Sequence, residues 1–155
     1  EPFSSNIRSS IRVKQSEKRH FADPSMACAI LNIKEEEKLI NDLETFGFLF
    51  EAMVERDLKI YADSFNAKCY HYQDYQNREV DSVIELENGE WCAFEVKLGA
   101  NKIEEGAKNL LKLKEEIQKE NGKAPSVLCV ICGLSNAVYK RPDGVYVVPI
   151  TALKP

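Results

Sequence analysis

Hydrophobic residues in the first half of the chain recur with a helical period. Apolar side chains occupy positions 43, 46, 50, 53, 54, 58 and 61, close to the 3.6-residue repeat of an amphipathic helix. This spacing predicts a long helix over 43–64. Two short helices are predicted before it. One is acidic and covers about 34–41, and the other covers 24–31 and begins at Asp23, a suitable N-cap, followed by Pro24.

After residue 66 the apolar positions tend to alternate, which is typical of strands. Three strands are predicted from KCYHYQDY (68–75), NREVDSVIEL (77–86) and EWCAFEVKL (90–98). The connections between them are short and include the turn pair Asn88–Gly89, so we expect an antiparallel meander.

A second long helix and two further strands complete the pattern. The segment NKIEEGAKNLLKLKEEIQKENGK has helical spacing over about 102–121, with Gly122 as its stop. The run SVLCVICG (126–133) is too apolar to alternate and is expected to be buried on both faces. GVYVVPI (144–150) is predicted as the last strand. The order helix, three strands, helix, strand, strand predicts an α/β fold, with a mixed central sheet flanked by helices.

Composition places the chain among ordinary globular proteins. Of its 155 residues, 44% are hydrophobic and 30% charged, and the length fits a single domain over 24–155. The longest apolar runs fall far short of the roughly 20 residues that a membrane span requires. Residues 1–20 also lack the apolar core of a signal peptide. We therefore expect a cytoplasmic protein without a membrane partner.

Charge is distributed unevenly along the chain. The net charge of −4 argues against general affinity for nucleic acid. The first 20 residues are nevertheless basic, with two acidic residues, Glu1 and Glu17, against Arg8, Arg12, Lys14, Lys18 and Arg19. We interpret 1–23 as an extended basic lead-in, which either contacts phosphates or is a solvated tail.

The cysteines do not form a metal-binding pattern. Only Cys129 and Cys132 make a CxxC, and strand alternation points these two side chains to opposite faces, away from a shared zinc. Free buried thiols in a reducing cytosol are the expected state. Five aromatic residues are likewise expected in the core rather than as platforms for nucleic-acid bases: Phe46, Phe48, Phe50, Trp91 and Phe94.

Three charged residues within the predicted sheet carry the candidate chemistry. Glu95 and Lys97 are two apart in the third strand and therefore share a face. In the second strand, alternation puts Asp81 on one face and Val80 with Ile84 on the other. If Asp81 and Glu95 are neighbours across the hairpin, two carboxylates and an ammonium converge on one patch.

Such a patch is typical of a divalent-cation site. Two carboxylates repel and raise each other's pKa. A cation that prefers oxygen ligands, Mg²⁺ or Mn²⁺, removes this repulsion. The lysine is then placed to orient or deprotonate a water, or to stabilise negative charge on a phosphate. The alternative is that these charges are ordinary solvent-facing groups of a hairpin.

The same residues resemble a known nuclease superfamily. An acid on the second strand (EVDSVIE), then Glu-x-Lys on the third (FEVK), then a helix, resembles the PD-(D/E)XK nucleases with their restriction-endonuclease-like fold. The resemblance covers about 43–133 and departs from the superfamily pattern at Val80, where the name of the superfamily has a proline.

The resemblance implies a role for each candidate residue. Asp81, Glu95 and the backbone carbonyl of Val96 would bind Mg²⁺ or Mn²⁺, and Lys97 would assist the attacking water. Glu51 in GFLFE would help through water or a second metal, and Glu55, one turn further on, is the alternative for that role.

Longer stretches are similar to a narrower family. The chain resembles the C-terminal domain of unknown function of bacterial and archaeal AAA+-type ATPases in KRHFADPSMACAIL, LETFGFLFEAMVERDL, YHYQDYQNREVDSVIE and AFEVKLGANKIEEGAKNLLKL. This resemblance implies an N-terminal ATPase domain as a partner. Because no GxxxxGK[ST] motif occurs and the chain does not begin with Met, we expect a C-terminal fragment without its ATPase part.

Three functions are compatible with these patterns. The first is a metal-dependent phosphodiesterase that acts on nucleic acid. The second is a non-catalytic module on the same fold that binds DNA or a protein partner, and the third is a regulatory domain that docks on the ATPase. The set of carboxylates favours the first function, whereas the acidic charge balance favours the third.

Overall fold

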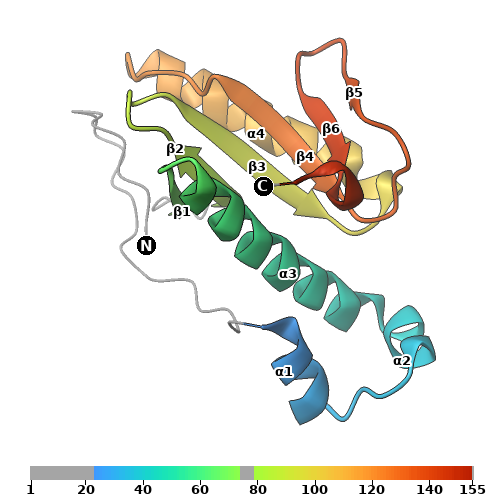
Figure 1. Ribbon diagram of the computed structural model, residues 1–155. Coiled ribbons are helices and arrows are strands. Elements are labelled where there is room, and N and C mark those ends of the chain that lie inside the picture. Colours follow the sequence, from blue (N-terminus) through green and yellow to red (C-terminus); the bar gives the residue numbers. More distant parts are fainter. Residues whose placement is uncertain (1–22, 74–78, 155) are drawn as a thin grey trace.

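The computed structural model describes residues 23–73 and 79–154 (Figure 1), so the predicted lead-in over 1–23 lies outside the described residues except for Asp23. The described elements, in chain order, are α1 (Pro24–Ile30), α2 (Glu36–Asn41), α3 (Leu43–Ser64), β1 (Lys68–Gln73), β2 (Glu79–Glu85), β3 (Trp91–Lys97), η1 (Ala100–Lys102), α4 (Ile103–Lys119), β4 (Val127–Cys132), β5 (Tyr139–Lys140), β6 (Tyr146–Pro149) and η2 (Ile150–Ala152). The α/β class predicted from the sequence is therefore confirmed. No helix in the described part of the chain combines the length and the apolar character of a membrane span.

The helices ahead of the sheet begin at the capping residues of the sequence. Asp23 accepts a hydrogen bond from the Ser25 backbone N–H (2.8 Å) and caps α1, as predicted. Asp42 caps α3 through the Thr45 N–H (3.1 Å), and α3 spans the residues that the helical period predicts. α1 and α2 pack on α3 at the end that extends beyond the sheet (Figure 1).

The described strands form one mixed sheet with the order β1-β2-β3-β4-β6-β5. β1, β2 and β3 make the predicted antiparallel meander, β4 lies parallel to β3, and β6 lies parallel to β4. The edge strand β5 was not predicted, because its two residues are too few to show any period.

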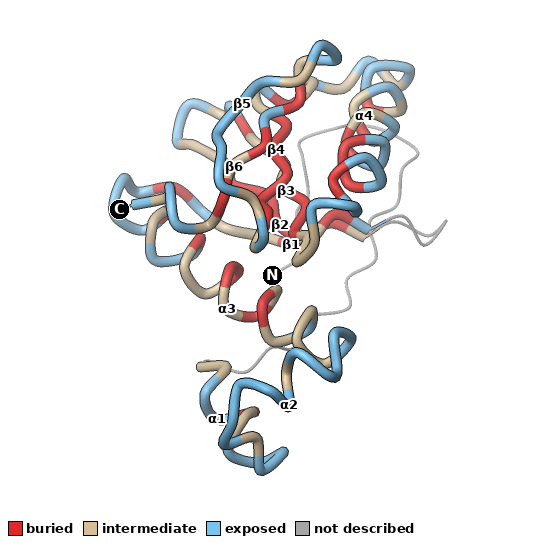
Figure 2. Tube along the Cα trace, turned by 90° about the vertical axis from the view of Figure 1, so that its right-hand side faces the viewer, coloured by how far each residue is buried: buried red, intermediate tan, exposed pale blue. Residues whose placement is uncertain are grey.

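α3 and α4 cover opposite faces of this sheet, and the buried residues lie where each helix packs on the strands (Figure 2). Phe50, Val54 and Leu58 of α3 share one core cluster with Val96 of β3. The other cluster contains α4 residues with Val83, Ala93 and Val130. β4 contributes to both clusters and is buried on both faces, as its apolar run predicts. This arrangement defines an α3 face and an α4 face of the sheet.

Alternation in β2 is broken, and the predicted faces of that strand are partly wrong. Tyr70 pairs with Val83 and Tyr72 with Val80, so two residues of β2, Asp81 and Ser82, lie opposite the single residue His71. The extra residue is a β-bulge. Val80 consequently joins the α4-face cluster with Val83, instead of the α3-face cluster that contains Ile84.

The core clusters test two further expectations, one about the CxxC cysteines and one about the aromatic residues. Cys129 lies in the α3-face cluster and Cys132 in the α4-face cluster, which confirms that these two thiols point to opposite faces of the sheet. Trp91 is buried, and its indole N–H donates to the Lys123 carbonyl (2.9 Å). Phe48, by contrast, is 64% exposed and does not belong to the core, because it projects from α3 on the side turned away from the sheet.

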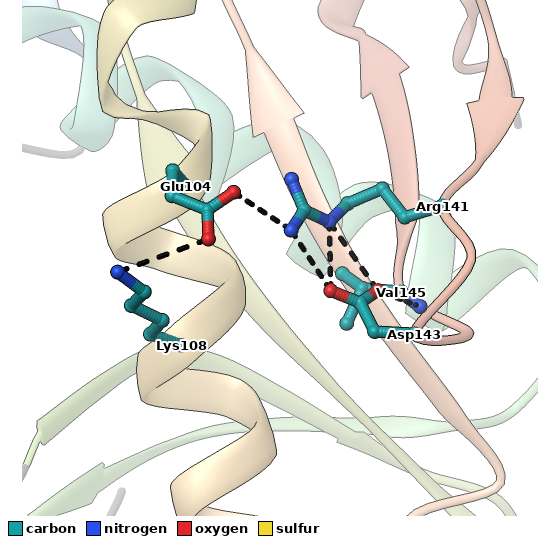
Figure 3. A network of polar contacts seen from close by, with 5 residues as sticks. All are labelled: Glu104, Lys108, Arg141, Asp143 and Val145. Carbon is teal, nitrogen blue, oxygen red and sulfur yellow. Dashed lines mark hydrogen bonds and ion pairs between the residues drawn. The ribbon is translucent and has the colours of Figure 1, made fainter.

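Arg141 connects the turn between β5 and β6 to α4 (Figure 3). Its guanidinium lies 2.8 Å from Glu104 on α4 and 2.8 Å from Asp143 in the turn. Asp143 also accepts a hydrogen bond from the Val145 N–H (3.1 Å), and Lys108 lies 3.8 Å from Glu104. Because the Glu104 side chain is largely exposed, we expect this network to stabilise the fold by no more than about 1 kcal/mol.

Candidate functional site

The bulge in β2 turns the Asp81 carboxylate towards β3. The backbone pairing of the two strands runs from Glu85 opposite Trp91 to Ser82 opposite Phe94. One residue further, Oδ2 of Asp81 accepts a hydrogen bond from the Val96 N–H at 2.7 Å. A side-chain oxygen therefore takes the place that a backbone carbonyl holds in a continuing ladder, and this fixes the carboxylate between the strands.

Glu95 is a buried carboxylate on the α4 face. It is only 2% exposed, and its Oε2 lies 2.8 Å from the Lys97 ammonium. Burial, and after it the negative charge of Asp81, raise the pKa of Glu95 to about 7, although Lys97 and Asn109 lower it. Burial and a second carboxylate disfavour the ionised form of this group, and a nearby cation would stabilise that form.

The Lys97 side chain is positively charged in this site. Burial lowers the pKa of Lys97, but the charges of Glu95, Asp81 and Glu105 outweigh this effect, so the pKa lies above its ordinary value. The amine is therefore protonated at neutral pH. Of the two roles that the sequence allowed, the structure favours stabilisation of negative charge over proton abstraction.

Gly106 lets α4 approach this pair closely. A Cβ atom at position 106 would lie 3.3 Å from Glu95 Cβ, 3.3 Å from Lys97 Cε and 3.3 Å from a methyl group of Val130. Such contacts are tighter than ordinary packing. The glycine in the interior of α4, which costs helix stability of about 1 kcal/mol, therefore has a packing reason next to the candidate site.

Substitution at this glycine tests the close approach. We expect Gly106→Val to lower the free energy of unfolding by about 1–3 kcal/mol, because the added atoms overfill a packed layer. Gly47 is a matched control, since it also lies within a helix but has no atom within 4 Å of an added Cβ. Gly47→Val should stay within about 0.5 kcal/mol of wild type in chemical denaturation. Equal losses in both variants would contradict this account of Gly106.

The structure brings Asp81, Glu95, Val96 and Lys97 together. In an antiparallel pair, the N–H and C=O of one residue point to the same neighbouring strand. The Val96 carbonyl is therefore directed to the side on which Asp81 lies, as a ligand role would require. Asp81 and Glu95 are the two carboxylates of this group. Among residues 23–73 and 79–154, no three His, Cys, Asp or Glu side chains lie close enough together to hold a metal ion.

Glu51 comes from a different element than these four residues. It lies half-buried on α3, which packs on the face of the sheet opposite to the Glu95 and Lys97 side chains. Glu55, the alternative, is buried on the same helix and raises the pKa of Cys69, which places it near β1. A role for either residue stays a prediction.

Asn109 was missed by reasoning from the sequence. Asn109, three residues after Gly106 on α4, lowers the pKa of Glu95. An asparagine on an exposed helix position carries no recognisable signal. The interior glycine was the available clue, because a glycine within a helix usually has a packing or functional reason.

Comparison with known proteins identifies a family. A family model described as a domain of unknown function (DUF4143) matches residues 46–153, which is more than half of the chain and includes every candidate site residue. Comparisons with curated proteins and with solved structures gave no match. The chain therefore belongs to the DUF4143 family of domains of unknown function.

Proposed function

We propose that this chain is a restriction-endonuclease-like domain of the PD-(D/E)XK superfamily that hydrolyses phosphodiester bonds in nucleic acid. Mg²⁺ or Mn²⁺ would be held by Asp81, Glu95 and the Val96 carbonyl. The observation that carries the proposal is a buried Glu95 with a pKa of about 7, beside a second carboxylate and a protonated lysine. A structural ion pair would need one carboxylate, and the second one creates a repulsion that a cation relieves.

The donor set fits a hard cation. Mg²⁺ is usually bound by one or two protein carboxylates, and keeps waters and substrate phosphates as its other ligands. Two carboxylates and a carbonyl supply this number without a third acidic side chain. A bound cation of this kind would polarise the phosphodiester and lower the pKa of a bound water.

The other parts of the chemistry belong to the protein side chains. The Val96 N–H donates to one oxygen of Asp81 at 2.7 Å and so fixes the position of this carboxylate beside β3. The Lys97 ammonium, held by Glu95 at 2.8 Å, is placed to stabilise the negative charge that develops on the phosphate. We also propose that Glu51 of α3 assists the metal site through a water molecule.

A cleavage assay tests this proposal. Labelled single-stranded DNA, double-stranded DNA and RNA are incubated with the protein in Mg²⁺, in Mn²⁺ or in EDTA. We expect cleavage of at least one substrate that requires the metal, and a rate at least about 100-fold lower in Asp81→Asn. Asp63→Asn makes the same chemical change at an exposed position on α3 and should cleave like wild type. Cleavage by Asp81→Asn at the wild-type rate, or no cleavage by wild type, would contradict the proposal.

A non-catalytic docking function is the second candidate. Several apolar side chains of α1 and its C-cap, of α2 and of the first turns of α3 are more than half exposed: Met26, Ile30, Leu31, Ile40, Leu43 and Phe48. Exposed apolar groups gathered at one end of a protein favour a protein partner, and the proposed partner is the N-terminal ATPase domain of a longer protein. Binding of that domain by wild type but not by Phe48→Ser, without nucleic-acid cleavage, would favour this function over hydrolysis.

A further inference from the structure

The apolar stripe of α3 continues beyond the end of the sheet. Phe50 and Val54 pack on the sheet in the α3-face cluster. Leu43 and Gly47 each lie seven residues before one of them, a spacing that puts all four on the same side of the helix. A Cβ atom on Gly133, the first residue after β4, would lie 3.1 Å from Cζ of Phe50. Phe50 is therefore at the end of β4, and the turns of α3 before it extend past the sheet (Figure 1).

This first part of the stripe is not covered by the described residues. Leu43 is 63% exposed. Apart from the neighbouring helix backbone, no atom of residues 23–73 and 79–154 would lie within 4 Å of a Cβ atom on Gly47. A glycine inside a helix is destabilising relative to alanine and usually has a packing or functional reason. Gly106 has such a reason in its close contacts, whereas Gly47 faces open space into which a partner could approach closely.

The surface around the start of α3 is acidic. Residues 34–48 carry two exposed lysines, Lys34 and Lys38, against five exposed acidic residues: Glu35, Glu36, Glu37, Asp42 and Glu44. Like charges that meet across an interface disfavour association. The same face of a second copy and the phosphates of a nucleic acid would therefore be repelled. Basic side chains around an apolar centre would complement this surface.

We propose that the start of α3, at Leu43 and Gly47, is the docking surface for an amphipathic helix of a protein partner whose apolar face is flanked by lysine or arginine. The inference rests on the docking function proposed above, to which it adds the chemistry of the partner, and it does not depend on the metal site. The separation of two packed helices depends on the side chains at their contact, so Gly47 allows a close approach. Leu43 packs against the apolar face of the partner helix, and the acidic side chains pair with its basic ones.

A pair of peptides tests the charge of the partner. One is a fluorescently labelled amphipathic helix with a leucine face flanked by lysine, and the other has glutamate in place of every lysine. Fluorescence anisotropy should show saturable binding of the lysine peptide, with a dissociation constant that rises with NaCl concentration. The glutamate peptide should bind at least about tenfold more weakly. Equal affinity for the two peptides, or no binding of the lysine peptide, would overturn the inference.

Three variants test the position of the surface. Leu43→Ser removes apolar contact area and Gly47→Val fills the open space, so each should raise the dissociation constant of the lysine peptide at least about tenfold. Ile60→Ser is the matched control, because Ile60 is also an exposed apolar residue of α3 but lies on a different side of the helix. It should bind like wild type. A loss in Ile60→Ser as large as that in Leu43→Ser would overturn the assignment of this surface.

Other occupants and other functions give distinguishable results. Wild-type protein that forms a dimer in sedimentation experiments, and loses it in Leu43→Ser, would assign this face to a second copy and overturn the inference. Binding of the ATPase domain without binding of the lysine peptide would overturn the charge assigned to the partner but leave the docking function in place. Metal-dependent cleavage of nucleic acid is measured separately and does not change with either result.

Discussion

Lys97→Met is expected to reduce phosphodiester cleavage by about 100- to 1,000-fold under single-turnover conditions. The variant keeps an unbranched side chain that packs against α4 at Gly106 but removes the ammonium 2.8 Å from Glu95. Lys97 is not a proposed metal ligand, so Mn²⁺ affinity at pH 8 should not fall more than a few-fold. This combination would assign Lys97 to the chemical step.

Lys102→Met is the control for this prediction. The Lys102 ammonium is more than half exposed and pairs at 2.9 Å with Glu105, whose charge also acts on Lys97. We expect it to change cleavage by less than about tenfold, because exposed ion pairs contribute little. A loss in Lys102→Met as large as that in Lys97→Met would point to general loss of positive charge near the substrate, and would contradict a specific role for Lys97.

Glu95→Gln is expected to change how stability depends on pH. The pKa of Glu95 is raised by burial from an ordinary value of 4.5 to about 7 in the folded protein. The folded state therefore binds the proton more tightly than the unfolded state. Stability from this group is fully present below pH 4.5 and is lost as the pH rises through 7. Between pH 5 and pH 8 the loss amounts to about 2–3 kcal/mol.

Chemical denaturation of the metal-free protein measures this effect. Glutamine is neutral at every pH, so the free energy of unfolding of Glu95→Gln relative to wild type should be about 2–3 kcal/mol more favourable at pH 8 than at pH 5. Added Mn²⁺ should reverse part of the wild-type loss at pH 8, because the cation favours the ionised carboxylate. Parallel pH profiles for the two proteins would show that Glu95 ionises normally in the fold and would remove the main support for a metal site.

Residues with a regular period were predicted well from the sequence. α3 spans the residues that its apolar spacing indicates, and the caps at Asp23 and Pro24 fix the start of α1. The meander followed from short turns, and the shared face of Glu95 and Lys97 followed from their two-residue spacing. Each of these features depends on local geometry, which the sequence encodes directly.

Features that depend on neighbouring elements were not predictable in this way. The bulge opposite His71 breaks the alternation of β2, and no residue type in that strand predicts a bulge. The burial that raises the pKa of Glu95 depends on the packing of neighbouring elements, and α4 lies close to Glu95 at Gly106. Tertiary packing decides both features. The assignment of Glu51 came from a resemblance, and its role stays a prediction.

Binding of Mn²⁺ to the metal-free protein tests the central claim most directly. Isothermal titration at pH 7.5 should show a saturable site in wild type and in Asp63→Asn, and a dissociation constant at least about 100-fold higher in Asp81→Asn, which keeps the shape of the ligand but loses its charge. Wild-type protein that binds no Mn²⁺, or Asp81→Asn that binds it as tightly as wild type, would contradict the claim that Asp81 and Glu95 form a metal site.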